Sequence, residues 1–125
     1  MKTDKYRNQA IKKYGKEAVE KWENNILKLP TNKFQELILK QKTNWEALFE
    51  NRFEEANSPF VQKLIREHHK ITAIFWGDKP DKISYKGLAD TYLQDSRYTT
   101  MDWEVHKEFA EFLAEAIGYF VKVNL

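Results

Sequence analysis

Residues 58–77 read Ser-Pro-Phe-Val-Gln-Lys-Leu-Ile-Arg-Glu-His-His-Lys-Ile-Thr-Ala-Ile-Phe-Trp-Gly, and they predict one helix with clear limits. Ser58 can accept a hydrogen bond at a helix N-cap, and Pro59 suits the first helical position. Gly77 is typical of a helix end. Between these limits apolar residues recur at helical spacing, so one face of the helix is expected to enter a core. The residues of that face are Val61, Leu64, Ile65, His68, Ile71, Thr72 and Phe75.

The N-terminal part of the chain also predicts helices. Apolar or aromatic residues recur every four positions from Tyr6 to Tyr14, where Gly15 interrupts the pattern. A second stripe, which includes Trp22, ends before Pro30. Both segments are rich in Lys, Glu and Asn, so they offer little apolar surface to a core.

Three further helices are expected besides these. A long apolar stripe predicts a helix over residues 32–56, and Ser84 is the expected N-cap of a short helix that carries Leu93. The last helix is expected to hold the apolar residues from Val105 to Phe120. Because no segment alternates with a period of two, the sequence predicts a single all-α domain of five or six helices over residues 1–125.

Composition excludes several classes of protein. The chain has 125 residues, no cysteine, and 21 Lys plus Arg against 19 Asp plus Glu, for a net charge of +2. Disulfide frameworks and thiol nucleophiles are thereby excluded. The charges are interleaved, which argues against direct nucleic-acid binding. No apolar run could span a membrane and no secretory signal is present, so a cytoplasmic protein is expected.

The sequence offers no recognisable catalytic or metal centre. His68 and His69 are adjacent and would point about 100° apart on a helix. His106 with nearby glutamates forms no familiar ligand set, and no Gly-x-Ser-x-Gly or phosphate-binding glycine loop occurs. We therefore expect no catalytic residue, no metal and no cofactor.

Three features favour a binding site, although each also has a purely structural interpretation. His68 lies on an apolar helix face, where it could equally be a hydrogen-bonded core histidine. Trp45, Phe49 and Phe53 follow one another at helical spacing, as in any core stripe. Residues 92–98, Tyr-Leu-Gln-Asp-Ser-Arg-Tyr, combine charge with aromatic rings, and their Asp and Arg could simply fix a turn.

Three stretches resemble a known family. They are Ser-Pro-x-Val-Gln-x-Leu-Ile leading to His68, Gly-Leu-Ala-Asp-x-Tyr-x-x-Asp-x-Arg-Tyr at residues 87–98, and Phe-Ala-Glu-Phe-Leu-Ala-Glu-Ala-Ile at residues 109–117. In this order and at these separations they resemble the TipAS family. TipAS is the antibiotic-recognition domain at the C-terminus of MerR-type transcriptional activators. The resemblance runs from near Tyr14 almost to the C-terminus.

The resemblance implies a globin-like helical fold with a cleft for thiopeptides or other large, flat, multi-ring antibiotics. It also implies that the N-terminal helices are loose without ligand, so residues 1–30 are expected to be mobile until a ligand binds. Some family members capture thiopeptides through a cysteine. This chain has none, and binding is expected to be reversible. No DNA-binding winged helix is present in the sequence, so the domain would act alone by sequestering a drug or belong to a longer regulator.

The leading hypothesis is a small-molecule or peptide-antibiotic binding domain with an aromatic site. The residues expected to line it are Trp45, Phe49, His68, Trp76, Tyr92 and Tyr98, with Asp95 and Arg97 supporting the rim. An alternative is an interaction module that passes a signal to a regulator partner or forms a homodimer. A third hypothesis is tetrapyrrole binding through His68.

Overall fold

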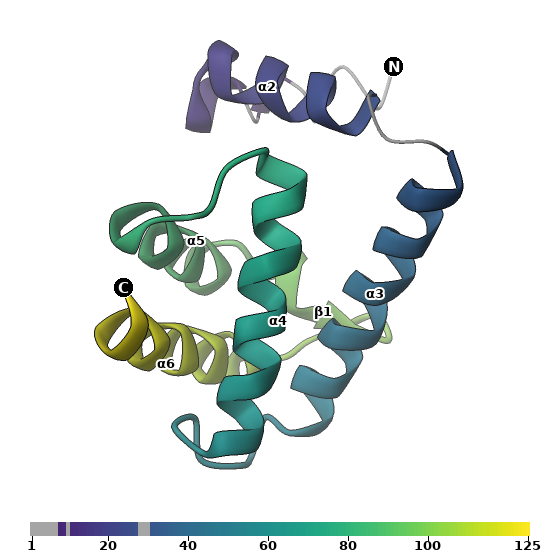
Figure 1. Cartoon of the computed structure of the whole chain (residues 1–125). Coiled ribbons are helices and arrows are strands. Elements are labelled where there is room, and N and C mark those ends of the chain that lie inside the picture. The colour runs from purple at the N-terminus through teal and green to yellow at the C-terminus, as the bar shows by residue number, and fades with distance from the viewer. Residues whose placement is uncertain (1–7, 10, 28–30) are drawn as a thin grey trace.

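The computed structural model describes residues 8–9, 11–27 and 31–125, and their regular structure is almost entirely helical (Figure 1). Residues 8–9 and 11–14 are helical. The elements that follow are α2 (Lys16–Leu27), α3 (Thr31–Glu50), α4 (Pro59–Trp76), α5 (Lys82–Gln94), the 3-10 helix η1 (Ser96–Thr99), β1 (Thr100–Met101), β2 (Glu104–Val105) and α6 (Lys107–Asn124). The prediction of an all-α, globin-like bundle is confirmed. Some residues on which the prediction of the first two helices rests lie outside the described part of the structure. They are Tyr6, Pro30 and the side chain of Trp22.

Helix α4 stands at the centre of the bundle, with α3 on one side and α5 and α6 on the other (Figure 1). Its limits are those that the sequence predicts. The Ser58 side chain accepts a hydrogen bond from the Val61 N–H at 3.2 Å, and Pro59 is the first helical residue. Gly77 ends the helix in the left-handed conformation, with φ of 76°. Both ends are therefore fixed by local contacts that the sequence encodes directly.

Gly77→Ala is expected to lower the free energy of unfolding by roughly 1–2 kcal/mol, because a Cβ atom disfavours the left-handed conformation. Urea unfolding measures this change. Gly87→Ala is the matched control, and it is expected to change the free energy of unfolding in the opposite direction. Gly87 lies inside α5, where an added Cβ would meet no atom within 4 Å. Alanine should stabilise that helix by roughly 0.5–1 kcal/mol. Equal effects at the two glycines would contradict this account.

Helix α3 ends at Glu50, so the prediction of a helix to Ala56 was wrong for residues 51–56. Two side chains explain the early end. Asn51 Nδ2 donates to the carbonyl four residues before it at 2.7 Å, and Arg52 Nη1 donates to the carbonyl three residues before it at 2.9 Å. These bonds satisfy carbonyl groups of the last helical turn, and the chain then turns toward α4.

Two predictions in the C-terminal half were also wrong. The N-cap of α5 is Asp81 rather than Ser84: the Ser84 N–H donates to Asp81 Oδ1 at 2.8 Å, and the Asp81 N–H donates to Ser84 Oγ at 2.9 Å. This reciprocal pair makes Ser84 the third helical residue. Val105 lies in β2, which pairs antiparallel with β1, and α6 begins two residues later.

The hydrophobic core lies where α4, α5 and α6 meet, joined by the C-terminal half of α3. Its fully buried apolar side chains are Leu48, Val61, Ile65, Tyr85, Phe109, Leu113, Ala116 and Ile117. Helix α6 presents one continuous apolar face to both α4 and α5, which explains why these three helices pack as one unit. This unit forms the rigid base on which the site described below is built.

Candidate functional site

A cavity of about 530 Å³ lies where α3, α4, α5 and η1 meet. Sites for small molecules commonly measure about 300–1,000 Å³, so the volume suits a multi-ring compound or part of one. Its aromatic lining residues are Tyr14, Trp45, Phe75, Trp76, Tyr92 and Tyr98, and its aliphatic ones are Ile38, Ile71 and Leu88. We call this space the aromatic cavity.

His68 lies in the wall of the aromatic cavity and is hydrogen-bonded at both ring nitrogens. Nδ1 lies 2.8 Å from Tyr85 Oη, and Nε2 lies 3.0 Å from Tyr92 Oη. Burial, together with the neighbouring His69, lowers the pKa of His68 to about 4. Burial also raises the pKa values of the Tyr85 and Tyr92 hydroxyls. The cluster is therefore uncharged near neutral pH.

Trp45 is held in place by three rings. Its ring centroid lies 5.1 Å from that of Phe109 and 5.3 Å from that of Tyr92, both in edge-to-face arrangements. The His68 ring is tilted against it at 6.0 Å. Such packing fixes the indole while leaving the residue half-buried at the cavity. Trp45 is thus a pre-ordered surface on which a flat ligand can stack.

Comparison with known proteins fits this geometry. A family model of the TipAS antibiotic-recognition domain matches residues 6–120. The chain belongs to this family. No curated protein and no solved structure matches it. TipAS is a ligand-binding domain and not a known enzyme family.

The structure brings most of the predicted lining residues of this TipAS domain to one cavity. Those that line it are Trp45, His68, Trp76, Tyr92 and Tyr98. Phe49 is not among them. Its ring packs edge-to-face on His106 at 4.8 Å and on Phe109 at 5.2 Å, one turn further along α3. Phe49 therefore packs between α3 and the start of α6, and it does not line the aromatic cavity.

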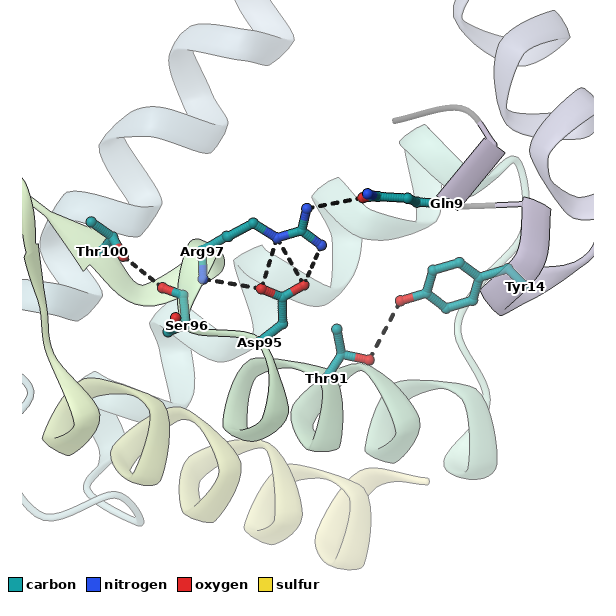
Figure 2. A network of polar contacts seen from close by, with 7 residues as sticks. All are labelled: Gln9, Tyr14, Thr91, Asp95, Ser96, Arg97 and Thr100. Atoms are coloured by element: carbon teal, nitrogen blue, oxygen red, sulfur yellow. Dashed lines mark hydrogen bonds and ion pairs between the residues drawn. The ribbon is translucent and has the colours of Figure 1, made fainter. Parts of the chain in front are cut away.

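Asp95 and Arg97 form an ion pair at the rim (Figure 2). Arg97 Nη2 lies 2.6 Å from Asp95 Oδ2, and the Arg97 backbone N–H donates to Asp95 Oδ1 at 3.1 Å. Hydrogen bonds from Arg97 lower the pKa of Asp95 to about 2. Arg97 Nη1 also donates to Gln9 Oε1 at 3.0 Å. The pair fixes the turn into η1 and places Arg97 among the lining residues.

Sequence reasoning missed several lining residues. Ile71, Thr72 and Phe75 follow His68 by three, four and seven positions and were expected on the same helix face, but that face was assigned to the core and not to a site. No spacing pattern in the sequence indicated that Asn44 and Tyr14 would line the cavity. Each comes from a different helical segment and reaches the cavity only through tertiary packing.

Two other hollows lie on the described part of the molecule. One, of about 600 Å³, shares Tyr14, Trp76 and Leu88 with the aromatic cavity. The other is a groove of about 800 Å³ between α3 and α4, beside the exposed Leu39 and Ile74. Among the described residues, no group of three His, Asp or Glu side chains gathers where it could hold a metal ion. No described helix has the length and apolar character needed to cross a bilayer.

Proposed function

We propose that this TipAS domain reversibly binds thiopeptide-like or other bulky multi-ring antibiotics in the aromatic cavity, as a cytoplasmic drug sensor or sequestering protein. One observation carries the proposal: the cavity combines pre-packed aromatic walls with a buried, neutral cluster of His68 and Tyr92. Apolar walls with a few oriented polar groups are the usual composition of a ligand site.

The affinity of such a site would come mainly from ring stacking and apolar burial. Trp45, Trp76 and Tyr98 come from three different elements around one space. Since Trp45 is already fixed by its neighbours, little side-chain entropy is lost when a ring stacks on it. No cysteine is present to form a bond with a ligand, which supports reversible binding.

We extend the proposal to the N-terminal helices, which would order fully only around a ligand. The contacts that tie them to the bundle include an exposed Lys21–Asp78 ion pair at 2.6 Å and a Tyr14–Thr91 hydroxyl contact at 3.4 Å. An exposed ion pair such as Lys21–Asp78 stabilises only weakly, and the Tyr14–Thr91 contact is long. Apolar surface on a bound ligand would add burial that the N-terminal sequence itself offers sparingly.

A thermal-shift screen against thiopeptides and other multi-ring peptide antibiotics tests the proposal. A compound that binds only the folded chain, at 100 times its Kd, adds about 2.7 kcal/mol and should raise Tm by roughly 10 °C. Trp45→Ala should then weaken binding of the best compound by roughly 30-fold, equivalent to about 2 kcal/mol.

Phe60→Ala is the control for this substitution. Phe60 is also an aromatic residue, but it is exposed at the start of α4 and does not line the aromatic cavity. Its removal should leave the affinity unchanged. Equal losses in the two variants, or no shift with any compound, would contradict binding in this cavity.

A second candidate is an interaction module that contacts a regulator partner or a second copy of the chain. The groove between α3 and α4 favours it, because Leu39 is 64% exposed and Ile74 is 46% exposed there. Sedimentation analysis over a range of concentrations tests self-association. Tetrapyrrole binding through His68 is not proposed, since both ring nitrogens are engaged by tyrosine hydroxyls.

A further inference from the structure

Four polar side chains reach the wall of the aromatic cavity although each residue is less than one-tenth exposed. They are Asn44, His68, Thr72 and Tyr92. Buried polar groups use some of their hydrogen-bonding capacity within the protein. The capacity that remains decides which ligand chemistry the wall can accept.

The hydrogen positions in the His68 cluster follow from one carbonyl group. Tyr85 Oη lies 3.3 Å from the carbonyl oxygen of Ile65, which can only accept, so Tyr85 donates there. Tyr85 then accepts from His68 Nδ1–H, and His68 Nε2 accepts from the Tyr92 hydroxyl. The opposite arrangement would turn the Tyr85 hydrogen toward His68 and leave two oxygen atoms facing each other with no hydrogen between them. Tyr92 therefore spends its only donor on His68.

Thr72 is committed in the same way. Its hydroxyl donates to the carbonyl oxygen of His68 at 2.8 Å, so only the lone pairs of Oγ1 remain. Asn44 donates from Nδ2 to the carbonyl oxygen of Leu64 at 2.9 Å, which fixes the orientation of its amide. Asn44 Oδ1 has no hydrogen-bond partner among the residues that the structure describes. Three buried residues that line the cavity thus keep hydrogen-bond acceptor capacity that the protein does not use.

We infer that the aromatic cavity selects ring systems that carry an N–H or O–H donor, and that Tyr92 Oη is the acceptor that determines this specificity. The inference rests on the proposed function, since it concerns the ligand of the same cavity. Tyr92 lies against Trp45 in an edge-to-face arrangement, with ring centroids 5.3 Å apart, and both residues line the cavity. The cationic residues that line the cavity, Lys42 and Arg97, are exposed, whereas Tyr92 is buried.

Three probes with the same fused-ring and phenyl framework test the inference, and 2-phenylbenzofuran serves as the planar probe without a donor, because the methyl group of 1-methyl-2-phenylindole adds bulk. 2-Phenylindole offers one N–H donor, 1-methyl-2-phenylindole offers none, and 2-phenylbenzofuran offers only an acceptor oxygen. In fluorescence titrations the full chain should bind 2-phenylindole roughly tenfold more tightly than either of the other two probes. The reason is that 2-phenylindole can donate a hydrogen bond to the buried acceptor, whereas the other two leave that acceptor unpaired. Equal binding of all three would overturn the inference while leaving the proposed function intact. Failure of all three to bind would overturn the inference if an antibiotic raises Tm in the thermal-shift screen, and would contradict both if none does.

Two variants locate the acceptor. Tyr92→Phe keeps the ring and removes the hydroxyl, so the preference for 2-phenylindole should disappear. Tyr119→Phe is the matched control, because Tyr119 is a partly exposed tyrosine of α6 that does not line the cavity. The preference should survive there. A preference retained in Tyr92→Phe would show that another group accepts, and would overturn the assignment to Tyr92.

Tyr85→Phe supplies a test that does not depend on the strength of binding. Without the Tyr85 oxygen, Nδ1–H of His68 has no acceptor, so the proton should move to Nε2 and the Tyr92 hydroxyl should become free to donate. Nitrogen-15 NMR of the imidazole should report Nδ1–H in the natural chain and Nε2–H in the variant. The variant should now favour 2-phenylbenzofuran. An Nε2–H form in the natural chain would overturn the inference.

Discussion

Phe109→Ala is expected to lower the free energy of unfolding by roughly 3–5 kcal/mol, the usual cost of removing a fully buried aromatic ring. Phe109 is 0% exposed and packs edge-to-face on both Trp45 and Phe49. It therefore joins α6 to α3 under the aromatic cavity. Urea unfolding at neutral pH measures the change, and an unchanged slope would show that the unfolded state is not altered.

The same substitution should also reach the binding site. Trp45 loses one of the three rings that hold it, so the affinity for any ligand stacked on the indole should fall although Phe109 itself does not line the cavity. Phe60→Ala removes an exposed phenyl ring and should change stability by no more than roughly 0.5 kcal/mol. A stability loss below about 1.5 kcal/mol in Phe109→Ala would contradict the central position given to this ring.

Local signals explain what the sequence could predict. The limits of α4 depend on Ser58, Pro59 and Gly77, each of which acts on residues within one helical turn. The N-cap of α5 was misplaced because Asp81 and Ser84 are both good capping residues, and only their reciprocal bonds decide between them. Strands β1 and β2 have two residues each, too few for any periodic pattern to appear.

The site was predictable only where one helix supplies it. The apolar face of α4 pointed to His68, but its partners Tyr85 and Tyr92 lie 17 and 24 residues further along the chain. Their hydroxyls reach His68 from α5 through tertiary packing, which spacing within a helix cannot show. Trp45 and Phe49 share a stripe but are displaced by about 6 Å along the helix axis, enough for only one to reach the cavity.

Acidification should destabilise the domain through His68. The pKa of His68 is about 6.5 in the unfolded chain and is lowered to about 4 by burial in the folded chain. Between these values the unfolded state binds more protons, so stability that is fully present above pH 6.5 is lost as the pH falls toward 4. The difference corresponds to about 3 kcal/mol, which urea unfolding at a series of pH values can measure.

His68→Gln is the control, because glutamine does not titrate. Its absolute stability will differ from that of the natural chain, so the comparison uses the slope of unfolding free energy against pH. Asp95, with its pKa lowered to about 2, contributes in both proteins and at lower pH. The tyrosines that face His68 from α5 stay neutral throughout this window. Between pH 6.5 and 4 the variant should lose clearly less stability than the natural chain. If the two proteins lost equal stability between pH 6.5 and 4, His68 would be protonated in the folded state as easily as in the unfolded state. The His68 cluster would then have to be accessible to water and not buried.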